Sequence, residues 1–163
     1  MSMTINDPST IDAEAFTVRR TVTIAATPDK VWAAVTRPEL ITQWFGNVAQ
    51  LDRLEVGAEG EFGFEGYGRF PVRIEELDAP HAIAYRWGNE NATPTTLDEH
   101  STVFRFTLEP LDEGAATRLT VVESGFDNLS DPAKAMESNR GGWDSELDEL
   151  VAFVEGSAVE GSA

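Results

Sequence analysis

Apolar residues alternate strictly with polar ones in one short segment of this chain after another, and this pattern limits the fold more than any other feature. The alternating segments are 17–24, 62–65, 70–75, 82–87, 103–108 and 118–121. Such segments form antiparallel strands with one buried face and one face in water. The run Gly66-Tyr67-Gly68 lies between two of them and is typical of a hairpin turn. The pattern predicts a curved antiparallel sheet of about six to seven strands.

A helix near the C-terminus is predicted to cover the buried face of this sheet. Asp131 is a suitable N-cap and Pro132 fits the first turn. Residues at spacings of three and four then make one stripe of about six turns, formed by Met136, Arg140, Trp143, Leu147, Leu150 and Val154. Two short helices are expected after the first strand, one beginning at Pro28 and one at Pro38. The fold class is therefore α+β, with an apolar pocket between the sheet and the long helix.

The length of 163 residues fits one domain. Residues 1–15 are polar and contain a cluster of helix-breaking residues, which predicts a flexible N-terminal arm. Residues 156–163 form a Gly/Ser/Ala-rich tail that we expect to be disordered. The folded domain is expected to span residues 16–155.

Charge and composition exclude several classes of function. The net charge of -17 argues against nucleic acid and anionic membranes as partners, because both require a basic face. The first residues lack the pattern of a signal peptide, which favours a cytoplasmic location. The chain has no cysteine, and its two histidines, His81 and His100, are not at metal-ligand spacing. We expect no metal and no cofactor, since a phosphate-binding glycine loop is also missing.

Strand parity and helix periodicity indicate which polar and aromatic side chains face the pocket. The candidate pocket residues are Arg20, Trp44, Phe64, Tyr85, Trp87, His100, Phe104, Phe106, Glu123, Arg140 and Trp143. Arg20 and Glu123 are predicted to lie on neighbouring strands and to pair inside the pocket, because a buried charge needs a partner. His100 is either an exposed residue or a proton donor or acceptor at the pocket mouth. Arg140 either extends into solvent or binds an anion.

Two adjacent glycines interrupt the predicted long helix at positions 141 and 142. A glycine inside a helix costs about 1 kcal/mol relative to alanine, so a packing reason is expected. Two explanations remain open from the sequence. Either the helix packs closely against the sheet at this point, or the missing side chains leave room for a ligand beside Trp143.

Several motifs resemble those of a known family. Residues 24–40 read IAATPDKVWAAVTRPEL, Trp-Phe follows at 44–45, and the later motifs are ESGF at 123–126 and Gly-Trp at 142–143. These motifs resemble the bacterial relatives of the activator of the heat-shock-protein-90 ATPase, within the START-like or SRPBCC superfamily. The resemblance implies a helix-grip fold, in which a curved sheet wraps around a long helix. It leaves a homodimer and a chaperone open as partners.

Two functions from different classes are compatible with these observations. The favoured hypothesis is a protein that binds a small hydrophobic or aromatic molecule in the pocket. The alternative is an enzyme of cyclase or hydrolase type that uses inward-facing polar groups as acid and base. A role as a chaperone cofactor is implied by the family resemblance alone. Several titratable groups converging in the pocket would favour the enzyme, whereas one arginine among aromatic rings would favour the binding protein.

Overall fold

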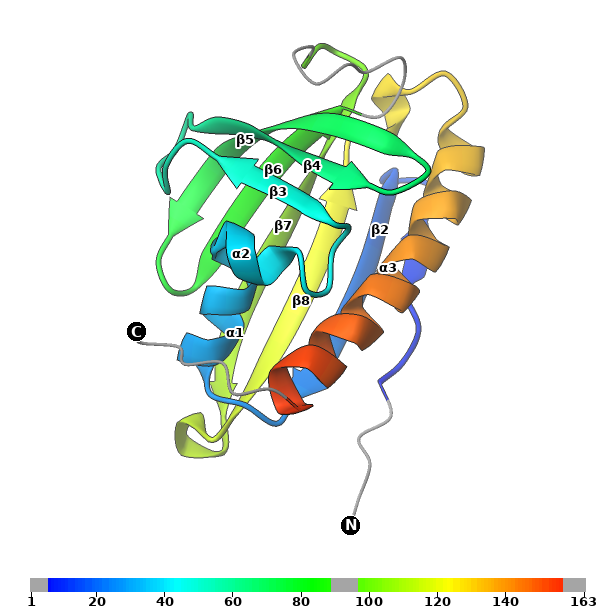
Figure 1. Cartoon of the computed structure of the whole chain (residues 1–163). Coiled ribbons are helices and arrows are strands. Elements are labelled where there is room, and N and C mark those ends of the chain that lie inside the picture. Colours follow the sequence, from blue (N-terminus) through cyan, green and yellow to red (C-terminus); the bar gives the residue numbers. More distant parts are fainter. Residues whose placement is uncertain (1–5, 89–96, 157–163) are drawn as a thin grey trace.

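The structure is a computed structural model that describes residues 6–88 and 97–156. Within these residues, eight strands form one antiparallel sheet in the order β1-β2-β8-β7-β6-β5-β4-β3 (Figure 1). The strands are β1 (Thr10–Asp12), β2 (Thr17–Ile24), β3 (Val48–Leu51), β4 (Glu59–Phe64), β5 (Gly68–Asp78), β6 (Ala82–Gly88), β7 (Ser101–Leu111) and β8 (Ala116–Ser124). The predicted antiparallel sheet is confirmed.

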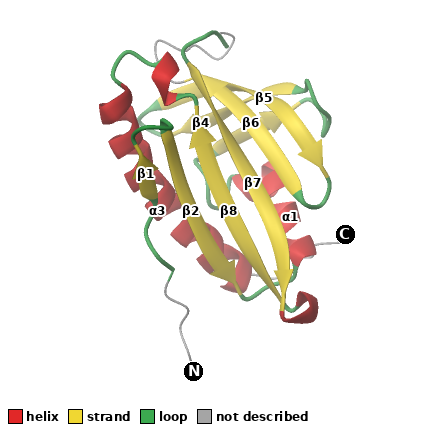
Figure 2. Ribbon diagram, turned by 180° about the vertical axis from the view of Figure 1, so that it is seen from behind, coloured by secondary structure: helices red, strands yellow, loops and turns green. Residues whose placement is uncertain are grey.

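All three α-helices lie on one side of this sheet, as the view from behind in Figure 2 shows. They are α1 (Pro28–Thr36), α2 (Pro38–Ile41) and α3 (Pro132–Gly156), and two short 3₁₀ helices, η1 (Asp112–Gly114) and η2 (Phe126–Asn128), complete the described elements. The Asp131 side chain accepts a hydrogen bond from the Lys134 backbone N–H at 3.2 Å, as expected of a cap. The predicted helices after the first strand and the long C-terminal helix are confirmed.

The inner face of the sheet and the apolar stripe of α3 form one core. On β2 the buried residues are Val18, Arg20, Val22 and Ile24, as parity predicted. The buried residues of α3 are Met136, Trp143, Leu147, Leu150 and Val154. The predicted stripe is therefore confirmed apart from Arg140, whose side chain is one-third exposed.

Two short strands bring the sheet to eight, where the sequence predicted about six to seven. β3 pairs with β4 and β1 pairs with β2. Each has only three or four residues, which is too few for an alternating pattern to stand out.

Residues 6–15, which the sequence assigned to a flexible arm, make specific contacts with the domain. Ile11 lies opposite Val18 in the sheet. Ser9 is buried; its backbone N–H donates to Asp144 Oδ1 at 2.6 Å and its hydroxyl donates to the Arg140 carbonyl at 2.7 Å. The structure of residues 6–15 therefore differs from the flexible arm predicted over 1–15. The contacts of Ser9 are polar, so no hydrophobic pattern in the sequence indicated them. Residues 1–5, and residues 157–163 of the tail predicted over 156–163, lie outside the described residues, and Gly156 is the last residue of α3.

No helix in the described part of the chain is long and apolar enough to cross a membrane.

Candidate functional site

A cavity of about 500 Å³ lies between α3 and the hairpin that joins β4 to β5. Figure 1 shows this hairpin reaching the N-terminal half of α3. The cavity is lined by Phe45, Phe64, Tyr67, Phe70, Trp87, Gly88, Glu123, Ser138, Asn139, Gly142, Trp143, Ser145 and Glu146. Its volume is within the range of about 300–1,000 Å³ that small-molecule sites occupy.

Aromatic rings form most of the apolar wall. Phe45 stacks on Trp143 with ring centroids 5.8 Å apart and an interplanar angle of 14°. On the sheet side, Trp87 is 5.7 Å from Phe70 and 6.1 Å from Phe64. Tyr67, at the tip of the hairpin, is 83% exposed and lies at the mouth of the cavity. Walls of this kind suit a flat apolar ligand.

Glu123, near the end of β8, is fully buried at the inner end of the cavity and is surrounded by donors. Its Oε1 accepts from Trp143 Nε1 at 2.9 Å and from Asn139 Nδ2 at 3.0 Å. Its Oε2 accepts from Thr102 Oγ1 at 2.5 Å and from Trp87 Nε1 at 3.1 Å. Burial raises the pKa of Glu123, and these donors oppose the rise. Both oxygens of Glu123 are therefore already occupied by groups of the protein.

Glu146, on α3, is the second carboxyl group of the cavity. Its Oε2 is buried, and no hydrogen-bond donor in the described part of the chain contacts it. Burial, and then the negative charge of Glu149, raise the pKa of Glu146 to about 7, while the backbone of Gly46 opposes the rise. An acceptor without a donor at the edge of an apolar cavity is costly unless a ligand supplies one.

Small residues on α3 open the cavity. Ser138, Gly142 and Ser145 face it at spacings of four and three. A Cβ atom built on Gly141 or Gly142 would meet nothing within 4 Å. Close packing of the helix against the sheet therefore does not explain these glycines. The second explanation, room beside Trp143, agrees with the position of Gly142 in the lining.

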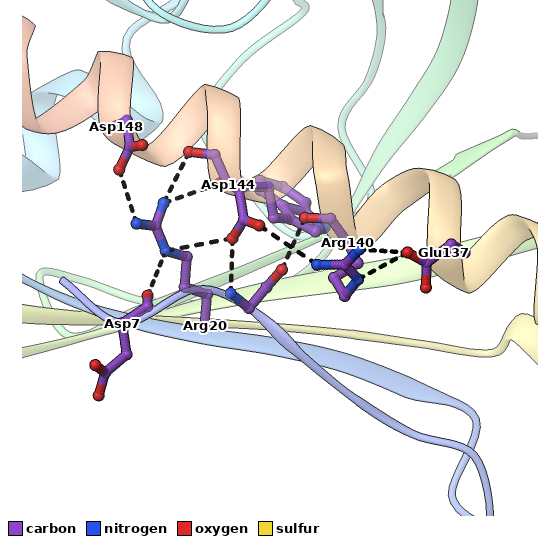
Figure 3. A network of polar contacts seen from close by, with 8 residues as sticks. Asp7, Arg20, Glu137, Arg140, Asp144 and Asp148 are labelled. Carbon is purple, nitrogen blue, oxygen red and sulfur yellow. Dashed lines mark hydrogen bonds and ion pairs between the residues drawn. The ribbon is translucent and has the colours of Figure 1, made fainter.

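Arg20 does not line this cavity. It reaches the face of α3 that carries Asp144 and Asp148, as Figure 3 shows. Its Nη2 pairs with Asp148 Oδ1 at 2.7 Å, and its Nε lies 3.7 Å from Asp144 Oδ1. Its remaining donors bind backbone carbonyls, at 2.9 Å for Asp7, 2.8 Å for Asp144 and 3.3 Å for Trp143.

The predicted pair between Arg20 and Glu123 is wrong. The two residues lie on neighbouring strands and face the same side of the sheet, since Arg20 is opposite Val121 and Glu123 is opposite Val18. The long Arg20 side chain, however, reaches the acidic face of α3 that borders β1. Parity predicts the face of a strand but not the direction of a side chain along that face.

The other predicted pocket residues fall into three groups. Phe64, Trp87, Glu123 and Trp143 line the cavity. Trp44, Tyr85, Phe104 and Phe106 are buried in the core beside it, where the Trp44 indole donates to the Ala34 carbonyl and the Tyr85 hydroxyl donates to the Val35 carbonyl. His100 and Arg140 are partly exposed and do not line the cavity; their acidic neighbours are Asp98 for His100, and Glu137 and Asp144 for Arg140.

Sequence reasoning missed Phe45, Phe70, Asn139 and Glu146 as cavity residues. Phe45 adjoins the predicted Trp44, and only the turn after α2 decides which of the two rings enters the cavity. Glu146 follows Ser138 and Gly142 at spacings of four, so the signal that could have found it is this row of small residues ending in a carboxylate.

A second hollow of about 370 Å³ lies over β3, β4 and β5. Its described lining holds Gln50, Asp52, Glu59, Gly60, Glu61, Pro71, Val72 and Leu97, with no aromatic ring. The described residues therefore do not give it the apolar wall of a small-molecule site.

Comparison with known proteins identifies the family. The sequence model of the family described as "Activator of Hsp90 ATPase homolog 1-like protein" matches residues 25–155. The chain belongs to this family. This match confirms the family that the sequence motifs predicted. A search of curated proteins gave no match.

Several solved structures have the same fold as this protein. Protein MLL2253 from Mesorhizobium loti is 25% identical with a TM-score of 0.71, and the match covers 88% of this chain and 99% of that one. DynU16, from the dynemicin biosynthetic locus, is 26% identical with a TM-score of 0.68, and the match covers 85% of this chain and 47% of DynU16. The chain thus spans about half the length of DynU16. The Aha1 dimer from Colwellia psychrerythraea is 18% identical over 85% of this chain and 96% of that one, with a TM-score of 0.66, and shows the fold alone.

Proposed function

We propose that this protein binds a small aromatic molecule in the cavity between α3 and the β4–β5 hairpin. The observation that carries the proposal is a cavity of about 500 Å³ that is walled by aromatic rings and bordered by a carboxylate oxygen, to which no described residue donates a hydrogen bond. Apolar walls with a few polar groups are typical of ligand sites. The similarity to DynU16, which comes from a biosynthetic locus, supports a small molecule as the partner.

The two adjacent glycines of α3 provide a matched test of this proposal. In Gly142→Leu the new side chain enters the cavity, whereas in Gly141→Leu it occupies open space outside the lining residues. We expect calorimetric titration with small aromatic compounds to show binding to the wild type and to Gly141→Leu, and at least about tenfold weaker binding to Gly142→Leu. Equal affinity of the two variants would reject the cavity as the site.

Mass spectrometry of small molecules retained on the purified protein would identify the ligand. We expect the wild type and Gly141→Leu to retain the same aromatic compound and Gly142→Leu to lose it. A compound retained equally by all three proteins would be bound elsewhere.

Glu146 favours acid–base catalysis as a second candidate function. A carboxyl group with a pKa of about 7 at an apolar cavity can both accept and donate a proton near neutral pH. Tyr85 does not fit this role, because burial raises the pKa of its hydroxyl and that hydroxyl already donates to Val35. The test is to incubate the retained ligand with the protein in D₂O. Deuterium incorporation or a change of mass that Glu146→Gln abolishes would support catalysis, and an unchanged ligand would reject it.

A further inference from the structure

The chemistry of the cavity lining restricts the class of ligand, and this inference rests on the proposed function. We propose that the cavity selects an aromatic molecule that carries a protonated amine, and that the ammonium group binds Oε2 of Glu146. Three features of the lining support this assignment: its charge, the hydrogen bonds that its carboxylates already accept, and its aromatic rings.

The ionisable side chains in the described lining are acidic, apart from the phenol of Tyr67. Glu123 and Glu146 are the two carboxyl groups, and the lining contains no lysine, arginine or histidine among the described residues. Arg20 does not compensate them, because its guanidinium is held by Asp144 and Asp148 on the other side of α3. A carboxylate ligand would therefore meet like charges without a cation, which is strongly unfavourable in a partly buried site.

The two carboxylates of the described lining differ in the hydrogen bonds that they already accept. Glu123 accepts from Trp87, Thr102, Asn139 and Trp143, so its oxygens are occupied. Oε2 of Glu146 is buried without a described donor. A ligand that supplies a donor at this position removes the cost of the unpaired oxygen.

A cationic donor fits this position better than a neutral one. Glu149, three residues further along α3, adds a second negative charge near Glu146, and a cation would relieve this repulsion. Trp143, Trp87 and Phe45 line the cavity, and an aromatic ring attracts a cation that lies over its face. A flat body would fill the apolar wall while the ammonium group binds the carboxylate.

Three probes of nearly the same shape separate charge from apolar contact. They are 1-naphthylmethylamine, 1-naphthalenemethanol and 1-naphthoate, titrated by calorimetry at pH 8, where the amine is protonated and Glu146 is largely ionised. We expect the amine to bind at least about tenfold more tightly than the alcohol, since a charge-assisted hydrogen bond contributes that much. The carboxylate is expected to bind most weakly of the three.

A matched pair of variants tests the role of Glu146. Glu146→Gln removes the charge at the cavity, and Glu149→Gln removes the same charge at an exposed position three residues further along α3. We expect Glu146→Gln to abolish the preference for the amine while the alcohol binds as before, and Glu149→Gln to keep most of the preference. Equal affinity for amine and alcohol in the wild type would overturn the proposal, as would an equal loss in both variants, which would indicate a general charge effect.

The same experiment separates failure of this inference from failure of the proposed function. If the alcohol binds and Gly142→Leu weakens it, but the amine has no advantage, the cavity binds aromatic molecules and the amine assignment alone is wrong. If none of the three probes binds, the proposed function and the amine assignment both fail.

Discussion

Two polar clusters lie on opposite sides of α3, and they satisfy their charges in different ways. On one side, the Arg20 guanidinium is surrounded by two carboxylates and three backbone carbonyls. On the other side, Glu123 and Glu146 share a cavity whose described lining contains no cation. A structural cluster tends to pair its buried charges, whereas a cavity that leaves a carboxylate oxygen without a donor is a candidate for ligand recognition.

Trp143 belongs to both clusters. Its backbone carbonyl accepts from Arg20 Nη1 at 3.3 Å, and its indole N–H donates to Glu123 Oε1 at 2.9 Å. The Arg20 cluster therefore helps to hold the residue that forms one wall of the cavity. Loss of Arg20 should act first on stability, whereas changes at Glu146 should act first on binding.

The largest effect is expected for Glu123→Ala. The two indole N–H groups of Trp87 and Trp143, together with the Asn139 amide, lose their buried acceptor. Each such loss costs about 1–3 kcal/mol, so the free energy of unfolding should fall by about 3 kcal/mol or more. Urea denaturation measures this change. Glu123→Gln keeps one acceptor oxygen and should fall between the wild type and Glu123→Ala; a loss below about 1 kcal/mol in Glu123→Ala would contradict the proposed donor cluster.

Arg20→Ala should have the next largest effect, about 2–3 kcal/mol. The change removes a buried guanidinium, and with it the hydrogen bonds to Asp148 and to the backbone carbonyls of Asp7 and Asp144. Asp148→Ala is the matched control, because the Asp148 side chain is 67% exposed and its loss should cost no more than about 1 kcal/mol. If the two variants lose equal stability in urea denaturation, the exposed ion pair rather than the backbone contacts holds this side of α3.

A gain in stability is expected when either helix glycine is replaced by alanine. Gly141→Ala and Gly142→Ala should each raise the free energy of unfolding by up to about 1 kcal/mol, because both positions are helical and have room for a Cβ atom. Thermal denaturation measures the gain. Destabilisation by either alanine would show that the helix needs glycine for its own packing and not for the cavity.

The last prediction concerns the pH dependence of stability at Glu146. Its pKa is about 7 in the folded protein, above the ordinary value of 4.5, so the folded state holds this proton more tightly than the unfolded state does. The stabilising contribution is fully present below pH 4.5 and is lost as the pH rises to about 7. Glu146→Gln should therefore gain stability relative to the wild type across this interval in denaturation series at several pH values. A constant difference between the two proteins would show that the Glu146 pKa is not raised.

Periodicity alone predicted most of the fold. Alternation predicted the inward face of β2 and β8, including Arg20 and Glu123, because successive side chains of a strand point to opposite faces. The spacing of Trp143, Leu147 and Leu150 predicted the buried stripe of α3 in the same way. β1 and β3 could not be predicted, since strands of three or four residues are defined by their pairing with a neighbour and not by their own pattern.

The sequence by itself determined the fold class, the family, the covering helix and four of the residues that line the cavity, because these depend on local periodicity and on motifs within the chain. Only the tertiary structure decided the partners of the buried charges. Arg20 and Glu123 face the same side of the sheet, but the position of α3 places Asp144 and Asp148 beside Arg20 and places Trp143 and Asn139 beside Glu123. It also turned Phe45 rather than Trp44, and the carboxyl group of Glu146, toward the cavity. Side chains find their partners across elements that are distant in the chain, and no pattern along one element contains that information.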